Sequence, residues 1–315
     1  MSPRGKVVTR FALTAVVTLA LLAVLVRDFG GSGDFVAAAR GARPSWVLVA
    51  FGASTACVLL TALRWQLVLR GMGHTLRFRR SLEVVLGTWP LAVVTPSRAN
   101  DLLRPLAVRD HVPLTAGTGS VLAEKAIDLF LLLAIAAAGA AVNGLWAWAG
   151  LVALVLLAEA VVLGLLAWRR KWLERMPLLR KRPETVEELF TAMAALVRSP
   201  GALASVATTS LAIRALTIVL THALLVSVGA DVPFEQTLTL WPAAMLAGVA
   251  PVTLGGMGTR DAAFIGLLAE HGTHVPESSV LVATVGYSLV AVWSFAVIGV
   301  PFMIRETLLL RRRET

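Results

Sequence analysis

The chain has 315 residues, of which 57% are hydrophobic, and its mean hydropathy is +0.78. These values exceed those of a soluble domain and indicate an integral membrane protein. The net charge of +10 could suggest nucleic acid, but the basic residues lie at the ends of apolar runs, so we expect no nucleic-acid partner. The single cysteine, Cys57, excludes a disulfide framework within the chain.

Apolar runs that approach or exceed the length of a bilayer span recur along the sequence. The first follows a basic N-terminus, and because no small-residue cleavage site follows it, we predict an uncleaved helix rather than a signal peptide. The predicted spans cover about 11–27, 46–63, 115–141, 145–168, 203–228 and 279–304. Two further apolar stretches, at about 82–112 and 236–270, are interrupted by proline and glycine.

The two interrupted stretches share a sequence pattern. Each contains Trp-Pro-X-Ala, beginning at Trp89 and Trp241, followed by a second proline and by an arginine near an aspartate. Matching interruptions in two halves of a chain indicate the substrate site of a membrane transporter; the alternative is a pair of harmless kinks. Because proline removes a backbone donor, we expect the helices to break at Pro90, Pro96, Pro242 and Pro251.

Loop charge predicts how these stretches cross the membrane. Basic residues concentrate in 64–80, 169–200 and the C-terminal tail, whereas 229–235 and 271–278 contain no Lys or Arg. With a cytoplasmic N-terminus, the positive-inside rule requires both interrupted stretches to return to the side from which they enter. We therefore predict an all-α polytopic transmembrane bundle with two re-entrant segments in an inverted-repeat arrangement, and with both termini cytoplasmic. Pairs of short tilted spans would give the same loop sides.

The basic 169–200 stretch also contains apolar residues such as Trp172 and Phe190. This mixture predicts either an amphipathic helix or helix pair on the cytoplasmic face, or a solvated linker.

Arg214 lies near the middle of a predicted span, where an ionisable residue costs about 2.5–3.5 kcal/mol. It shares one helical face with Ser210, Thr217 and Thr221. It would either line a path for an anionic lipid headgroup or form a structural ion pair, for instance with Glu159.

Glu124 and Asp128 are four residues apart and share one face of another predicted span. They would neutralise Arg98 or Arg104 of the first interrupted stretch, or carry protons for coupled transport. Lys125 lies between them in sequence and could reach the membrane interface.

Both interrupted stretches contain charged residues. In the first, Arg98, Asp101 and Arg104 are spaced three apart, so a short helix would present them on one side. In the second, Arg260 and Asp261 follow a glycine-rich turn that permits close approach of a ligand, and an exposed helix N-terminus there would favour an anion such as phosphate. The glycines of this turn are Gly255, Gly256 and Gly258.

The sequence contains no familiar catalytic pattern. Its five histidines have no metal-ligand spacing with carboxylates, and there is no Gly-X-Ser-X-Gly motif. The glycine run lacks the lysine and the serine or threonine of a P-loop. We therefore expect no catalytic residues, no metal and no cofactor.

Four segments resemble the lysylphosphatidylglycerol synthase transmembrane, or flippase-like, family. They are Arg-Trp at 64–65, Pro-Ser-Arg-Ala-Asn-Asp-Leu-Leu-Arg at 96–104, Glu-Lys-Ala-Ile-Asp at 124–128 and Pro-Val-Thr-Leu-Gly-Gly-Met-Gly-Thr-Arg-Asp-Ala at 251–262. The resemblance implies one domain over residues 1–315, with two re-entrant segments, that moves lipids with polar headgroups between leaflets. Bifunctional members also have an aminoacyl transferase domain; because the chain ends at Thr315, we expect none here.

Several positions depart from the family pattern. Ser97 and Asn100 replace glycines of the usual Pro-Gly-X-X-Gly-Glu motif, Asp101 and Asp261 replace glutamates, and Lys125 replaces an arginine. These changes keep the charge but shorten the reach of the side chain or reduce backbone flexibility.

The leading hypothesis is a translocator of an anionic phospholipid or a polyprenyl-linked glycolipid in the bacterial inner membrane. Arginines would engage the lipid phosphate, and carboxylates would hold the arginines or a basic headgroup. One alternative is a membrane partner of a glycosyltransferase or lipid synthase, docked through the basic 169–200 surface. Another is a membrane-embedded lipid-modifying enzyme that uses Glu124, Asp128 or His222. The candidate substrate-binding residues are Arg98, Asp101, Arg104, Glu124, Asp128, Arg214, Gly255, Gly256, Gly258, Arg260 and Asp261.

Overall fold

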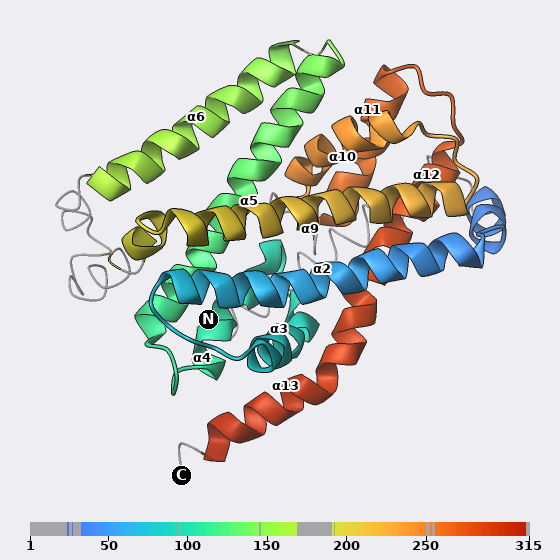
Figure 1. Cartoon of the computed structure of the whole chain (residues 1–315). Helices are drawn as coiled ribbons and strands as arrows, with labels where there is room; N and C mark the ends of the chain where they lie inside the picture. Colours follow the sequence, from blue (N-terminus) through green and yellow to red (C-terminus); the bar gives the residue numbers. More distant parts are fainter. Residues whose placement is uncertain are drawn as a thin grey trace, which may run out of the picture.

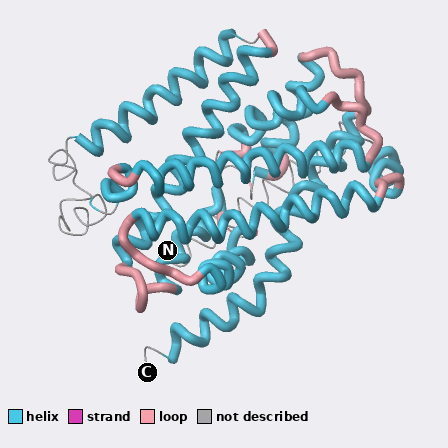
Figure 2. The backbone as a smooth tube through the Cα atoms, in the orientation of Figure 1, coloured by secondary structure: helices cyan, strands magenta, loops and turns pink. Residues whose placement is uncertain are grey.

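A computed structural model describes residues 33–93, 95–144, 146–168, 193–249 and 256–312, together with Val24, Arg27, Thr191 and Thr253. The described residues form helices joined by loops and no strand, which confirms the all-α prediction (Figure 1; Figure 2). Most of the predicted span 11–27 and most of the 169–200 stretch lie outside the described residues. So do Pro251, Gly255 and the side chain of Arg98.

Four described helices are long and apolar enough to cross a membrane, so the chain is an integral membrane protein. Three of them are α2 (Pro44–Gly71), α5 (Leu114–Val142) and α9 (Pro200–Ser227). The fourth runs over Glu277–Leu309 and comprises α12 (Glu277–Ser288), a π-helical turn (Leu289–Trp293) and most of α13 (Ser294–Arg312).

Helices α2 and α9 lie side by side along much of their length and run in opposite directions (Figure 1). Helix α2 extends well beyond the predicted span 46–63, so the expectation that Arg64 and Arg70 lie in a loop is wrong. The helix continues because protein groups satisfy its polar side chains. The indole Nε1 of Trp65, for example, donates to Ser120 Oγ at 2.9 Å.

The first interrupted stretch consists of α3 (Phe78–Ala92), a 3₁₀ helix (Pro96–Leu103) and α4 (Arg104–Ala107). The second consists of α10 (Phe234–Ala247), a glycine-rich turn and α11 (Thr259–Glu270). Both stretches are therefore interrupted as predicted, but each interruption lies after the Trp-Pro pair.

Pro90 lies inside α3 and Pro242 inside α10, so the predicted breaks at these two prolines are wrong. A proline is tolerated inside a membrane helix when neighbouring elements cover the distorted backbone. Gly299 of α13 provides the room at Pro90, since a Cβ there would lie 2.8 Å from the proline Cδ.

Each interrupted stretch packs against a long helix from the other end of the chain. Helix α3 packs on α13, and α10 packs on α5. Both contacts depend on glycine: a Cβ on Gly139 of α5 would lie 2.4 Å from Thr239 O, and one on Gly299 would lie 2.3 Å from Leu86 O. The re-entrant course and the inverted repeat stay predictions.

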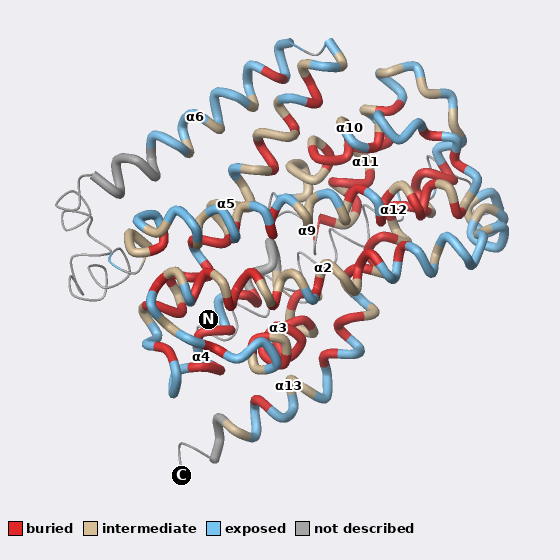
Figure 3. Tube along the Cα trace, viewed as in Figure 1, coloured by how far each residue is buried: buried red, intermediate tan, exposed pale blue. Residues whose placement is uncertain are grey.

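Helix α6 (Trp146–Trp168) packs on α5 and is otherwise mostly exposed (Figure 3). Its exposed residues are largely apolar, as expected for a surface that faces lipid. Buried hydrophobic residues concentrate instead where α2, α3, α4 and α13 meet, and where α9, α10, α11 and α12 meet.

Candidate functional site

Among the described residues, seven ionisable side chains form one connected chain of alternating charge between α2, α5, α9 and the first interrupted stretch. Every carboxylate in this charge chain lies between two cations, and the cations outnumber the carboxylates by one. In order, its members are Lys125, Asp101, Arg104, Glu124, Arg64, Asp128 and Arg214.

Arg64 joins three helices at the centre of the charge chain. Its Nε donates to Glu124 Oε1 at 3.1 Å, and its Nη1 donates to Asp128 Oδ1 at 2.5 Å and to Ser210 Oγ at 3.1 Å. The Arg64 side chain is only 5% exposed. Our sequence prediction omitted Arg64 from the site because it assigned this residue to a loop. The Arg-Trp pair within the family resemblance was the available signal.

Arg104 connects the first interrupted stretch to α5. Its Nη1 donates to Glu124 Oε2 at 3.0 Å, which confirms the expected neutralisation of Arg104 by this acidic face. Its Nη2 donates to Asp101 Oδ1 at 2.7 Å, as the spacing of three residues on one helix side predicted. Asp101 also pairs with Lys125, a residue that our candidate set left out.

Arg214 of α9 ends the charge chain on the other side. Its Nη2 lies 3.4 Å from Asp128 Oδ1 and 3.4 Å from the Asp128 backbone oxygen. Arg214 therefore pairs with Asp128 and not with Glu159, the partner considered from the sequence. The stripe on α9 faces inward as expected, because Ser210 and Thr221 are buried.

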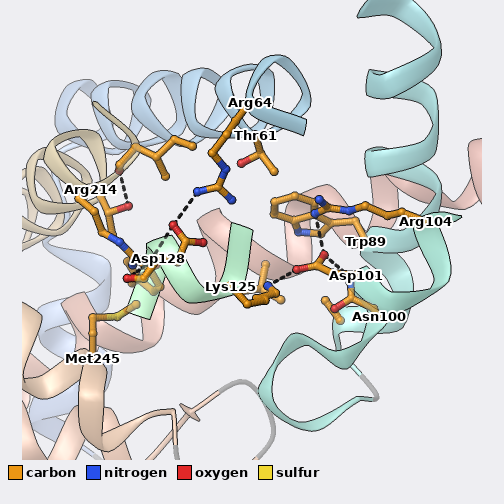
Figure 4. Close-up of a pocket in the computed structure, with 15 residues that line it drawn as sticks. Thr61, Arg64, Trp89, Asn100, Asp101, Arg104, Lys125, Asp128, Arg214 and Met245 are labelled. Atoms are coloured by element: carbon orange, nitrogen blue, oxygen red, sulfur yellow. Dashed lines mark hydrogen bonds and ion pairs between the residues drawn. The ribbon is translucent and has the colours of Figure 1, made fainter. Parts of the chain in front are cut away.

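A cavity of about 70 Å³ lies beside the charge chain (Figure 4). Both terminal cations, Lys125 and Arg214, line it, and so do Trp89 and Asn100 from the first interrupted stretch. Three of the residues that line it each have a buried polar atom without a hydrogen-bond partner: Asn100 Oδ1, Arg104 Nε and Arg214 Nε. Roughly 10–15 Å³ of such space holds one water, so the cavity can hold a few waters or a compact polar group.

The second interrupted stretch contains a separate, closed cluster around Asp261. Its Oδ2 accepts from the Gly258 backbone N–H at 2.9 Å, and its Oδ1 accepts from Arg260 Nη2 at 2.6 Å. Both Arg260 and Asp261 are buried. The condition for an anion site here, an exposed helix N-terminus, is not met, because the Asp261 carboxylate accepts from the Gly258 N–H at the start of α11.

Arg260 makes its remaining contacts inside the protein. Its Nη2 donates to Thr284 O at 3.1 Å and to Ser288 Oγ at 3.0 Å. Its guanidinium carbon lies 5.3 Å from the ring centroid of Trp241 and 4.6 Å from that of Tyr287. Tyr287 also lines the cavity.

The structure thus divides the candidate residues into two groups. The charge chain brings together Asp101, Arg104, Glu124, Asp128 and Arg214. The closed cluster contains Gly258, Arg260 and Asp261, and it adjoins Gly256; the two glycines have φ angles of 91° and 77°, which favour glycine. Gly255 and the side chain of Arg98 lie outside the described residues.

A second, larger cavity of about 330 Å³ lies between α11 and α12. Its lining is mainly apolar and includes His274 and Glu277, but no residue of the charge chain. Within the described ranges, no group of His, Cys, Asp and Glu side chains is arranged to hold a metal ion.

The family described as the lysylphosphatidylglycerol synthase TM region matches residues 9–299. This match confirms the resemblance seen in the sequence, and it indicates a function connected with membrane lipids. No curated protein matches the chain.

Proposed function

Because the chain belongs to the lysylphosphatidylglycerol synthase transmembrane family, we propose that it carries a lipid with an anionic headgroup between the leaflets of a membrane. The observation that supports the proposal is the polar cavity beside the charge chain, which has one positive charge in excess. An anionic phosphate supplies the charge that this site lacks.

The energetics favour a transport role for the charge chain. An isolated ionised side chain costs about 2.5–3.5 kcal/mol near the bilayer centre on insertion scales. Pairing offsets this cost for Arg64 and Glu124, which are buried. A lipid headgroup faces a similar barrier in hydrocarbon, and a protein-lined polar cavity lowers it.

The packing of the interrupted stretches is also consistent with transport. Helix α2 pairs with α9, whereas α3 pairs with α13 and α10 pairs with α5. In an inverted repeat, the interrupted stretch of each half can pack on a long helix of the other half, as α3 and α10 do here. Such repeats place the substrate between discontinuous helices. The proposal includes a bacterial inner membrane location with both termini cytoplasmic.

Leaflet transfer in proteoliposomes tests the proposal. A fluorescent anionic phospholipid is placed in both leaflets, and a membrane-impermeant reductant reports the fraction that reaches the outside. We expect faster transfer with the wild type than in protein-free vesicles, and slower transfer with Arg214→Gln. Arg70→Gln is the control, because Arg70 is an exposed cation at the end of α2. Equal rates with and without wild-type protein would contradict the proposal.

The contacts of His222 give less support to the alternative of a membrane-embedded lipid-modifying enzyme. His222 Nδ1 lies 3.3 Å from Thr237 Oγ1, and its ring packs on Phe234. His222 does not line the cavity, so the structure does not bring it to the charge chain with Glu124 and Asp128.

A further inference from the structure

We infer that the cavity beside the charge chain selects a phosphate headgroup that bears a hydroxyl group, such as a glycerol phosphate or sugar phosphate, and that it rejects a cationic, aminoacylated headgroup. The inference rests on the proposed function, since it names the substrate class of the same site. It follows from counting which donors and acceptors of the site are already used.

No carboxylate of the charge chain is available for a cationic headgroup. Asp101 binds Arg104 and Lys125, and Glu124 binds Arg64 and Arg104. Asp128 binds Arg64 and Arg214. An ammonium group in the cavity would have to displace one of these cations, and it would add positive charge to a site that already has an excess.

The two terminal cations provide the positive charge for a phosphate. Among the described residues, Lys125 pairs only with Asp101, and Arg214 pairs only with Asp128. Arg104 Nε and Arg214 Nε are buried donors without a partner, and both residues line the cavity. Buried donors of this kind require an acceptor, and phosphate oxygens are strong acceptors for guanidinium groups.

Asn100 adds a requirement for a donor on the ligand. Its Nδ2 donates to Thr88 O at 3.1 Å, and because a carbonyl oxygen only accepts, this contact fixes the orientation of the amide. The Oδ1 is therefore the atom without a partner, and the residue is only 2% exposed. A hydroxyl group next to the phosphate would satisfy it, whereas a phosphate oxygen would not.

The size of the cavity agrees with a compact headgroup. Its volume of about 70 Å³ lies between Trp89, Tyr287 and the charge chain. A phosphate with a short polyol is of the size of a few waters.

Transfer of three lipids in proteoliposomes tests the selectivity. Phosphatidylglycerol has the phosphate and hydroxyl groups, phosphatidylmethanol lacks the hydroxyls, and lysylphosphatidylglycerol has a cationic headgroup. We expect phosphatidylglycerol to move roughly tenfold faster than phosphatidylmethanol, because a buried acceptor left without a donor carries a penalty of that order. We expect lysylphosphatidylglycerol to move no faster than in protein-free vesicles. Equal rates for the first two lipids, or transfer of the lysyl lipid as fast as phosphatidylglycerol, would overturn the inference and leave lipid transport intact.

Matched variants assign the selectivity to residues. Asn100→Ala should abolish the difference between phosphatidylglycerol and phosphatidylmethanol by slowing the former. Lys125→Gln should slow both lipids, and Lys125→Arg, which keeps the charge, should lose less. Arg70→Gln should match the wild type. An unchanged preference in Asn100→Ala would contradict the assignment of the hydroxyl contact.

Calorimetric titration of the purified full-length chain in detergent, with glycerol phosphate and with methyl phosphate, separates the inference from the proposed function. Tighter binding of glycerol phosphate without transfer of any lipid would refute the transport proposal and retain the headgroup selectivity. Neither binding nor transfer would refute both.

Discussion

The Nη1 atom of Arg64 lies 2.5 Å from Asp128 Oδ1. This ion pair joins α2 to α5, two helices that are long and apolar enough to cross a membrane. The same guanidinium holds Glu124 through its Nε atom. Arg64 is thus shared by two carboxylates, and each of these also has a second cation as partner.

The first prediction concerns this central position. Arg64→Ala should lower the free energy of unfolding by about 3–5 kcal/mol, because it removes a partner from two carboxylates, one of them fully buried. Unfolding of the purified protein in mixed detergent micelles measures the change. Arg64→Lys should recover part of the loss, since one ammonium group cannot reproduce the guanidinium contacts. An unfolding curve of Arg64→Ala that overlays that of the wild type would contradict the prediction.

The second prediction concerns the glycines that allow α10 and α3 to pack closely. Gly139→Ala and Gly299→Ala should each destabilise the protein by about 1–3 kcal/mol, because the new Cβ would overlap a backbone oxygen of the partner helix. Gly150→Ala is the matched control, since a Cβ there meets nothing within 4 Å. Thermal unfolding should separate the first two variants from the third. Equal melting temperatures for all three variants would show that α5 and α10, and α3 and α13, can move apart to accept a Cβ without loss of stability.

The third prediction distinguishes the closed cluster from the charge chain. Asp261→Ala leaves the buried Arg260 without its carboxylate and removes the cap of α11, so we expect a loss of about 3–5 kcal/mol and a low yield of folded protein. Lys125→Gln should keep the yield near that of the wild type, because the Lys125 side chain is 38% exposed, and it should lose transport instead. Size-exclusion profiles combined with the transfer assay check both. A well-folded Asp261→Ala protein without transport would place Asp261 in the transport step itself.

The fourth prediction concerns two neighbouring arginines on α3. Arg80 pairs with Glu306 of α13 through both carboxylate oxygens and donates to Ala107 O at 2.8 Å, so it joins α3, α13 and α4. Arg80→Ala should destabilise by about 1.5–3 kcal/mol, the range for hydrogen bonds to charged groups. Arg79→Ala should have little effect, because the Arg79 side chain is 88% exposed. Melting curves that show equal losses for both variants would contradict this difference.

The fifth prediction tests the membrane course of the interrupted stretches. In a Cys57→Ala background, Thr75→Cys and His111→Cys should react with an impermeant thiol reagent from the same side if 82–112 returns to the side it enters, as we predict. Asp231→Cys and His274→Cys should both react from the opposite side. Labelling of Thr75→Cys and His111→Cys from opposite sides would show that 82–112 crosses once.

The sequence predicted those features that depend on local spacing. The face shared by Glu124 and Asp128 and the spacing of Asp101 and Arg104 follow from helix geometry, and the structure contains both. The role of Arg64 did not follow, because a charged residue directly after an apolar segment indicates the end of a span. Its burial depends on carboxylates sixty and more residues away in the chain.

The second interrupted stretch likewise shows that sequence spacing does not predict long-range or turn-dependent contacts. Its glycines suggested close approach of a ligand, and an anion would be favoured there if the helix N-terminus were exposed. Asp261 itself fills that position. Spacing alone could not decide this, because the contact depends on α11 beginning directly after Gly258, which places Asp261 three residues into the helix start.

The pairing of α3 with α13 imposes an order on biosynthesis. A ribosome makes α3 early and α13 almost at the end of the chain, so the face of α3 that packs on α13 has no protein partner for most of translation, although α3 can already pack on α2. Helix α5 likewise precedes its partner α10. Both early helices must be held by lipid or by the insertion machinery until the later ones arrive, and a nascent chain that stops before residue 294 exposes α3 to misassembly and degradation.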